Sequence, residues 1–551
     1  MRFAVCVAVA ILHSGAAAGQ STNSQIKFEI AAIQPSAPST RTFMSGPYLH
    51  PDRYEIRNAT MVDLVRTAYG IDPDKVSGGP NWLEFDRFDL IAKVPAGTQA
   101  NALKTMLQDL LAERFKLVVH SDTKQFPAYA LSLGKTPRLK EADASSAGSG
   151  GCSFRGNSSP PLPGATGPGG PMILTMSCHS TSLTAFANSI RGFVGTSATN
   201  GGPPQVIDKT ELKGVYDLDL KITMDNGFGG SDSAFIDAID KQLGLKLETI
   251  QVPMPVIVVE KVNRKPGDNP PDAAKSFPPL PTEFEVVSLK PGTPLPLPTP
   301  GRGNVRTPPY QNDRVNLQNN SVRQLINLAW NLTPADTIAG APKWLDSDHY
   351  DLVAKVPVAA APAGRGPVDI DAYRPMFKAV LEDRFQMKVH FEDRPTDVYV
   401  LTAVKPKLQK ADPANRTKWT EGPGPDGKDP RKTNQALNRL ICFQNVTMAQ
   451  FAALLPVVAG GYLRTPALDN TGLDGGWDFT LSFSAAGMVN GMSGRGGDAG
   501  PNAAVPSASE PSGGLSLFDA INKQLGLKLV TQKRPMPTLV IDHIEQKPAD
   551  N

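Results

Sequence analysis

The segment "DAIDKQLGLKLETIQVPMPVIVVE", from Asp237 to Glu260, occurs a second time in the chain with few changes. The second occurrence, "DAINKQLGLKLVTQKRPMPTLVID", runs from Asp519 to Asp542, 282 residues later. Aligned without a gap, the two segments are identical at 15 of 24 positions. Self-similarity at a fixed offset indicates that the chain is built from repeated structural units.

The repeat extends over most of the chain, and its landmarks keep the same order. "KFEIAAIQPS" at Lys27 corresponds to "EFEVVSLKPG" at Glu283, and "GGPNWLEFDRFDLIAKVP" at Gly78 corresponds to "AGAPKWLDSDHYDLVAKVP" at Ala339. Two more pairs follow: "AERFKLVVH" with "EDRFQMKVH", and "VIDKTELKGVYDLDLKI" with "ALDNTGLDGGWDFTLSF". Residues 27–263 and 283–551 are therefore two copies of one unit, joined by a Pro-rich linker at 264–282.

Each copy also shows an internal duplication. An aromatic–Asp–apolar triplet on a predicted strand occurs four times, at Phe88-Asp89-Leu90, Tyr216-Asp217-Leu218, Tyr350-Asp351-Leu352 and Trp477-Asp478-Phe479. A Ser or Thr that opens a helical pattern precedes each triplet, at Thr60, Ser182, Ser321 and Thr447. We infer four quarter-units: copy 1 consists of halves at 27–140 and 172–263, and copy 2 of halves at 283–411 and 438–551.

Local signals define the helices of a quarter. Ser321 with Gln324, and Thr447 with Gln450, form predicted capping boxes, in which the hydroxyl and the amide side chain satisfy backbone groups at the helix start. Gly244 ends a helix, because glycine accepts the left-handed conformation that a helix end requires.

The strands follow from alternation and from the prolines. Leu245 to Glu248 alternates between apolar and polar residues, as a half-buried strand does. Pro253-Met254-Pro255 is interpreted as a corner, followed by a further strand at Val256 to Val259. Each quarter is thus predicted as β-α-β-α-β-β, and the fold class as α+β with small mixed sheets. The stretches 145–171, 359–367, 412–433 and 485–514 are predicted to be flexible insertions, because they are rich in Gly, Pro, Ala or Ser.

Composition and the first residues indicate an exported protein. The formal net charge of +3 on 551 residues argues against a nucleic-acid partner, because such proteins usually carry a basic domain or patch. "MRFAVCVAVAILHSGAAAGQS" has the short positive start, apolar run and small residues of a secretory signal peptide, assigned to 1–19. We expect no membrane span in the mature chain, and a periplasmic or extracellular location.

The cysteines fit that compartment. Cys152 and Cys178 flank one Gly/Pro-rich stretch and are the natural disulfide pair in an oxidising environment. Cys442 has no obvious partner, so it is either a buried small apolar residue or a site of pairing between chains. Cys178-His179 is an isolated dipeptide, which falls short of the ligand number that zinc requires, so no metal site is predicted.

Candidate chemical groups also have structural interpretations. Asp89 and Asp217 could act as acid and base, but a carboxylate present four times (Asp89, Asp217, Asp351 and Asp478) is better explained as an acceptor for backbone amides. His120 and His390 occupy equivalent places after a strand, where a polar residue is more common than a catalytic base. No nucleophile elbow GxSxG, P-loop or HExxH motif occurs, and no catalytic residue or cofactor site is assigned.

The repeated landmarks resemble a known family. "GGPNWLEFDRFDLIAKVP", "MLQDLLAERFKLVVHSDTKQFPAYAL" and "VIDKTELKGVYDLDLKI" look like the uncharacterised exported paralogous family of soil Acidobacteria, a domain of unknown function, present here twice. This resemblance implies export and no established activity. "DAIDKQLGLKLETIQVPMPVIVVE" is also similar to the short N-terminal domain of secretins and TonB-dependent receptors, which implies docking to other envelope proteins.

Two functions therefore stay open. The first is an exported, non-catalytic module that binds envelope proteins or glycans, as the fourfold repetition favours. The second is an extracytoplasmic hydrolase with a carboxylate-based site. A polar cluster present in one quarter only, beside a deep pocket, would favour the second.

Overall fold

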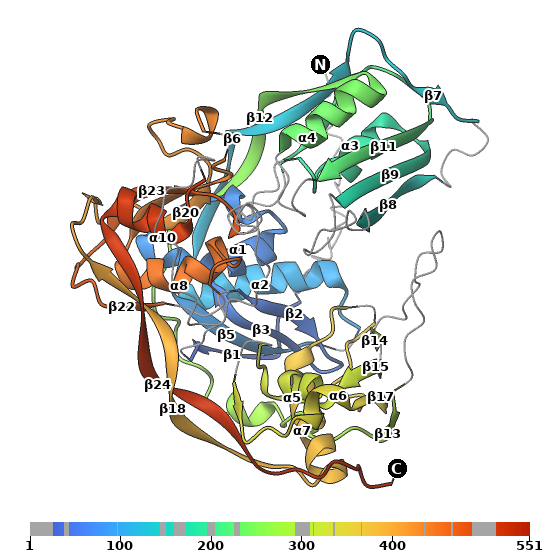
Figure 1. The fold of residues 1–551 in the computed structure, drawn as a ribbon, viewed down its shortest axis with the longest axis vertical. Helices are drawn as coiled ribbons and strands as arrows, with labels where there is room; N and C mark the ends of the chain where they lie inside the picture. The colour runs from blue at the N-terminus through green and yellow to red at the C-terminus, as the bar shows by residue number, and fades with distance from the viewer. Residues whose placement is uncertain are drawn as a thin grey trace, which may run out of the picture.

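The computed structural model describes residues 26–37, 43–95, 97–143, 150–158, 172–194, 204–224, 232–292, 309–311, 313–333, 337–364, 366–434, 436–463, 467–486 and 514–550. The predicted signal peptide at 1–19 lies outside these ranges, as does most of the predicted insertion at 485–514. The arrangement of the elements is shown in Figure 1.

The first half of copy 1 combines an antiparallel sheet with two helices. Its elements are β1 (Ile30–Pro35), β2 (Ser45–Leu49), β3 (Arg53–Thr60), α1 (Met61–Tyr69), β4 (Val76–Gly78), β5 (Arg87–Lys93), α2 (Ala100–Phe115) and β6 (Val118–Leu133). The sheet has the order β1-β5-β3-β2. Thr60 caps α1 through the backbone N–H of Asp63, and the apolar face of α1 at Met61, Leu64 and Val65 is buried. The helices and one face of the sheet share a single apolar core.

The second half of copy 1 repeats this order. Its elements are β7 (Lys140–Glu141), β8 (Gly151–Ser158), β9 (Met172–Thr181), α3 (Leu183–Ile190), β10 (Val206–Asp208), β11 (Tyr216–Met224), α4 (Asp232–Ala238) with a π-helical turn at Ile239–Leu243, and β12 (Leu245–Lys261). The sheet order β7-β11-β9-β8 matches β1-β5-β3-β2 strand for strand. Gly244 ends the helix at φ 65°, as predicted.

Copy 2 follows the same plan. Its first half contains β13 (Val286–Pro291), β14 (Tyr310–Gln311), β15 (Arg314–Ser321), α5 (Val322–Trp330), β16 (Ile338–Ala339), α6 (Trp344–Ser347), β17 (His349–Lys355), α7 (Ile370–Arg384) and β18 (Lys388–Ala403). Its second half contains β19 (Gln409–Lys410), β20 (Lys418–Glu421), β21 (Arg439–Val446), α8 (Met448–Val458), β22 (Leu468–Asp469), β23 (Trp477–Phe483), α10 (Leu517–Ala520) with a π-helical turn at Ile521–Leu525, and β24 (Leu527–His543). The sheets β13-β17-β15-β14 and β19-β23-β21-β20 repeat the order again, so the α+β fold and its inner duplication are confirmed. Two stretches predicted as insertions, 145–171 and 412–433, contain strands β8 and β20.

The predicted corner at Pro253-Met254-Pro255 is wrong. Leu245 to Lys261 form one uninterrupted strand, β12, which pairs with β6 in an antiparallel register from Leu245–Leu133 to Lys261–Val118. The same long ribbon, made of β18 and β24, occurs in copy 2. The last two strands predicted for each quarter are therefore a single long strand, and a quarter has the order β3-α1-β4-β5-α2-β6 after its first two strands.

The prolines of these ribbons lie at positions where no N–H is needed for pairing. Pro395 of β18 lies directly opposite Pro535 of β24. Neither residue has an N–H, so this pair belongs to the non-hydrogen-bonded positions, and both nitrogens face outward. Pro253 and Pro255 of β12 correspond to Pro535 and Pro537 by the repeat. Prolines at outward-facing positions remove donors that a further strand would need, which protects an exposed edge from unwanted pairing.

Each ribbon exchanges strands between the two halves of its copy. In the mixed sheet β10-β6-β12-β4, the short strand β10 of the second half pairs with β6, and the short strand β4 of the first half pairs with β12. Leu131 of β6 is buried in the core of the second half, whereas Val259 of β12 is buried in the core of the first. Copy 2 shows the same exchange with Leu401 and Leu539. The two halves of a copy therefore complete each other's cores.

Candidate functional site: the polar junction between the copies

The four strand aspartates have one local environment. In each quarter one carboxylate oxygen accepts a backbone N–H from the neighbouring strand: Asp89 from Asn58 at 2.8 Å, Asp217 from Ser180 at 3.1 Å, Asp351 from Asn319 at 2.7 Å and Asp478 from Asn445 at 2.7 Å. The donors all have positive φ, between 45° and 55°. Each lies at a break in the strand register, two residues before a helix N-cap. The carboxylates are thus committed to β-bulges that lead into helices.

The sequence pointed to the aspartates but not to their donors. Asn stands two residues before the N-cap in three quarters, at Asn58, Asn319 and Asn445, and Ser180 takes that place in the fourth. Asn tolerates the left-handed conformation better than most residues. An Asn at a fixed distance before a helix-opening Ser or Thr is the signal that could have identified the bulge.

The two equivalent histidines lie on the exposed ribbons. His120 is paired with Glu260 at 2.6 Å, and His390 with Asp542 at 2.9 Å. Hydrogen bonds to Asp542 and Glu392 raise the pKa of His390 above its usual value. Both side chains are about half exposed and engage carboxylates of the adjacent strand or of their own, a common arrangement on a strand surface.

The disulfide region differs between the two copies. Cys152 of β8 and Cys178 of β9 lie directly opposite each other and are disulfide-bonded. In copy 2 the directly opposed pair at the corresponding place in the sheet is Trp419 and Phe443, and both of these side chains are buried. A covalent link in one copy is thus replaced by large apolar side chains in the other. Cys442 is a free, half-buried cysteine, and burial raises the pKa of its thiol.

Two further aspartates, Asp208 and Asp469, hold turns that precede strands β11 and β23. Asp208 and Asp469 accept hydrogen bonds from the backbone and hydroxyl of Thr210 and Thr471, as expected of Asx-type turns. Within the described ranges, no group of three or more His, Cys, Asp or Glu residues is placed to hold a metal ion. None of the described helices has the length and apolar composition needed to cross a bilayer.

A buried polar cluster joins the two copies and was not foreseen from the sequence. Strand β3 of copy 1 contributes Arg53, Glu55 and Arg57 on the face of the sheet turned away from its own helices, and His50 precedes them. Copy 2 contributes Asp369, the N-cap of α7, which accepts the backbone N–H groups of Asp371 and Ala372. Of these five residues, all but Arg57 are at least 94% buried.

Ion pairs cross the junction at this cluster. Arg57 donates to Asp369 with one nitrogen at 3.0 Å from Oδ1 and another at 2.8 Å from Oδ2, and it also pairs with Glu55. His50 Nε2 lies 3.6 Å from Asp369 Oδ2. Burial tends to raise the pKa of Asp369, but the neighbouring His50 and Arg57 outweigh it and lower that pKa. The Asp369 carboxylate therefore stays ionised inside the interface.

Backbone groups extend the same contact. Arg53 donates to the carbonyl of Pro278 in the linker at 2.7 Å, and the backbone N–H of Ala363 donates to the carbonyl of Leu49 at 2.7 Å. The outer face of strand β3 and the end of β2 are thus in contact with the linker and with the segment that precedes α7.

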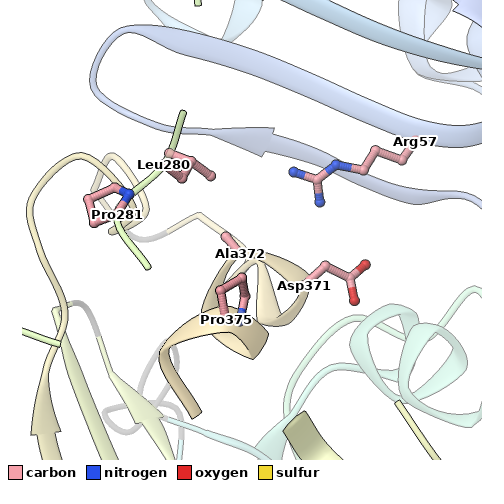
Figure 2. Close-up of a pocket in the computed structure, with 6 residues that line it drawn as sticks. All are labelled: Arg57, Leu280, Pro281, Asp371, Ala372 and Pro375. Atoms are coloured by element: carbon pink, nitrogen blue, oxygen red, sulfur yellow. The ribbon is translucent and has the colours of Figure 1, made fainter. Parts of the chain in front are cut away.

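A cavity of about 390 Å³ borders the cluster. It is lined by Arg57, the linker residues Leu280 and Pro281, and three residues of α7, namely Asp371, Ala372 and Pro375. Figure 2 shows the Arg57 side chain reaching from the strand toward the space between the linker and the start of α7. The polar groups of the wall already have partners, because Arg57 is paired with Asp369 and Asp371 with Arg374 at 2.7 Å.

A second contact links the other half of copy 2 to the same half of copy 1. Arg416, which precedes β20, lies 2.9 Å from Glu84 and donates to the carbonyl of Val76 at 2.8 Å. Burial raises the pKa of Glu84, and Arg416 opposes this shift. The first half of copy 1 therefore contacts both halves of copy 2, which the β18–β24 ribbon connects along one side of the molecule (Figure 1).

The charged residues that copy 1 contributes to the cluster are not repeated in copy 2. In copy 2 the positions of His50, Glu55 and Arg57 are taken by Gln311, Asn316 and Gln318, and Arg314 stands at the position of Arg53. Charges present in one copy and absent from the other could have indicated a contact specific to copy 1. Their partner Asp369, however, lies 312 residues from Arg57 in the sequence. Pairing at that separation could not be inferred from a single sequence.

The comparisons agree with the duplication. The family model described as Protein of unknown function (DUF3738) matches residues 62–262 and 323–544, one region in each copy. No curated protein and no solved structure matches the chain. With both regions matched over most of its length, the chain belongs to the DUF3738 family.

Proposed function

We propose that this protein is an exported, non-catalytic protein-interaction module of the cell envelope. The observation that carries the proposal is the junction between the copies. Copy 1 uses the outer face of its first-half sheet to bind linker and α7 segments through a buried, ion-paired cluster. The fold thus already acts as a surface for binding protein segments.

The geometry of the cluster favours docking over catalysis. Glu55 and Asp369 share Arg57 as their counter-ion, and their side chains are 8% and 0% exposed. A general acid or base must reach the proton that it transfers. Carboxylates that are buried and paired in this way hold an interface together, because breaking such a pair leaves an uncompensated charge.

Export is supported by the first residues and by the disulfide. The start of the chain has the pattern of a signal peptide, and Cys152 is bonded to Cys178. Disulfides persist mainly in oxidising compartments such as the periplasm and the cell exterior. The resemblance to exported acidobacterial proteins and to the secretin docking domain points the same way.

The alternative, a carboxylate-based hydrolase, would need an accessible acid–base pair. The polar cluster beside the cavity is the feature that could have favoured it. Its carboxylates are buried and paired, so no observation on the cluster favours hydrolysis over docking.

The proposal is tested by affinity capture with the full mature chain. The immobilised protein is incubated with an envelope extract, and retained material is identified by mass spectrometry against an unrelated exported protein of similar charge. We expect specific retention of one or a few proteins. Turnover in a screen of ester, glycoside and peptide substrates, with no protein retained, would overturn the proposal in favour of the hydrolase.

A further inference from the structure

The central strands β11 and β23 of the second halves lack most of the edge strand that their first-half counterparts have. In the first halves, β1 and β13 pair with six residues of β5 and β17. In the second halves, β7 and β19 pair with only two residues of β11 and β23. Along the rest of that side of β11 and β23, the described part of the chain supplies no further strand. Such an edge presents backbone groups that can pair with another chain.

Two glutamine side chains bond to these edges. Gln242, in the π-helical turn before β12, accepts the backbone N–H of Lys221 at 2.9 Å and donates to the carbonyl of the same residue at 2.6 Å. Gln524 makes the same two bonds with Ser482 of β23, at 3.0 Å and 2.6 Å. One carboxamide thus satisfies both backbone groups that a paired strand would otherwise engage.

The bonded residues hold equivalent places in the four sheets. Counted from the aspartate of the aromatic–Asp–apolar triplet, Lys221 matches Lys93 of β5. The carbonyl of Lys93 accepts the backbone N–H of Glu29, immediately before β1, at 3.0 Å. In copy 2 the same count matches Ser482 with Lys355, which accepts a backbone N–H beside β13 at 2.9 Å. Each glutamine therefore takes over contacts that the backbone of an edge strand makes in the first halves.

The edge of β11 is complementary to a second copy of itself. Backbone groups alternate between the two sides of a strand, so those of Asp219 point to the same side as those of Lys221. Both side chains are exposed. In an antiparallel pair of β11 strands centred on Leu220, Lys221 of each chain lies opposite Asp219 of the other. Opposite charges at directly opposed positions stabilise such a pair.

A third carboxamide closes another edge in the same way. Asn269 accepts the backbone N–H of Ile33, on the edge strand β1, at 2.9 Å and donates to its carbonyl at 3.0 Å. We propose that Gln242 and Gln524 act as substitutes for an edge strand, and that Gln242 prevents two copies of this chain from pairing through β11. This role of the glutamines does not depend on the proposed function.

Gln242→Ala tests this role in the full mature chain. Self-association is measured by sedimentation velocity over a range of protein concentrations. We expect the dimer association constant to rise about tenfold or more over the wild type, because two unpaired edges can then exchange backbone hydrogen bonds. Salt should weaken this association, since the charges of Lys221 and Asp219 are exposed and screened. In dilute samples, hydrogen exchange at the amide of Lys221 should be faster than in the wild type.

Three further variants separate the outcomes. Gln251→Ala removes an exposed glutamine from the β6–β12 ribbon and is expected to change neither measurement. Adding Lys221→Asp to Gln242→Ala places like charges opposite each other and should reverse the association. Gln242→Glu keeps an acceptor for the N–H of Lys221 but no donor for its carbonyl, so it should also associate more strongly than the wild type, and it replaces the alanine variant if that variant does not fold.

Two results overturn the proposal. The first is an association constant that stays at the wild-type value in both Gln242→Ala and Gln242→Glu, even if exchange at Lys221 is faster. The second is association of Gln242→Ala that persists when Lys221→Asp is added, because the contact then lies elsewhere than at β11.

Discussion

Each strand aspartate satisfies a backbone amide that the sheet cannot. At a bulge the residue with positive φ turns its N–H away from the ladder, and a buried amide without an acceptor is costly. Asp478 accepts this N–H from Asn445 at 2.7 Å, and the same contact recurs in the other three quarters. Because this contact occurs in all four quarters, it stabilises a structure that they share, the bulge between a strand and the following helix.

Substituting Asp478 tests this role. We expect Asp478→Ala to lower the free energy of unfolding by about 1–3 kcal/mol, because the amide of Asn445 loses its acceptor. Asp478→Asn keeps an oxygen at that place and should lose less. The free energies are measured by urea unfolding, and the retention of proteins from envelope extract is measured in parallel at a temperature where all variants are folded. Normal stability with lost binding would instead place the aspartate in a functional site.

At the residue scale the sequence predicted the aspartate and the helix N-cap of each bulge, but not the residue that donates its N–H. The aromatic–Asp–apolar triplets and the capping residues are local patterns, and the capping boxes at Ser321 and Thr447 are confirmed. The donor residues were missed, since positive φ at Asn319 or Ser180 depends on how two strands are paired.

The long ribbon is the element that makes one copy from two halves. β6 and β12 pair over their full lengths, and the end of each strand completes the core of the opposite half. The repeated segment at Asp237 and Asp519 thus contains a strand that contacts its own half, the partner strand of the ribbon and the other half.

Strand exchange predicts that a substitution in a strand of one half destabilises the core of the other half. Leu131 lies on β6, after the helices of the first half, yet it is fully buried in the core of the second half. We expect Leu131→Ala to cost about 2–5 kcal/mol, as truncation of a buried leucine does. Relative to the wild type, hydrogen exchange followed by mass spectrometry should become faster in β9 and α3, with a smaller change in β3 and β5.

The matched control is Leu107→Ala in α2, which is equally buried but belongs to the core of the first half. Its effect should appear in β3 and β5. If Leu131→Ala loosened the first half and left the second unchanged, the exchange of strands would be wrong.

The ribbon could not be predicted from the sequence. Alternation at Leu245 to Glu248 identified a strand, but Pro253 and Pro255 usually indicate a turn or a strand end. Only the pairing shows that these prolines sit where an outward-facing N–H is dispensable. Pairing between β6 and β12 joins residues more than a hundred positions apart, and no local pattern encodes that.

At the scale of the whole molecule, the junction makes the two copies different. The duplication was evident from sequence identity, and composition together with the linker separated the copies. The contact between them depends on Arg57, Asp369 and Arg416. Nothing in the local sequence of these residues indicates that they pair with the other copy.

Acid should weaken this junction. The pKa of Asp369 is held below its ordinary value of 3.8, so its ionised form stabilises the folded state. That contribution is complete above about pH 4 and is lost as the pH falls through the lowered folded-state pKa. We expect Asp369→Asn to be less stable than the wild type by about 1–3 kcal/mol at pH 7, and the difference to shrink below about pH 4.

The measurement is urea unfolding at a series of pH values. Asp346→Asn is the control, because Asp346 pairs with Arg323 within copy 2 and is 58% exposed. Such a surface pair contributes about 0–1 kcal/mol. A difference between Asp369→Asn and the wild type that grows as the pH falls would contradict the role assigned to the ionised carboxylate.

The central claim is that the outer face of the first-half sheet of copy 1 binds protein segments through the ion-paired cluster of Arg57 and Asp369. A double-mutant cycle tests it most directly, because it isolates the pairwise interaction from the effects of the single substitutions. Arg57→Gln, Asp369→Asn and the double variant are compared with the wild type by urea unfolding at pH 7. The account predicts that the double variant loses less stability than the sum of the two single losses. Losses that simply add would contradict it.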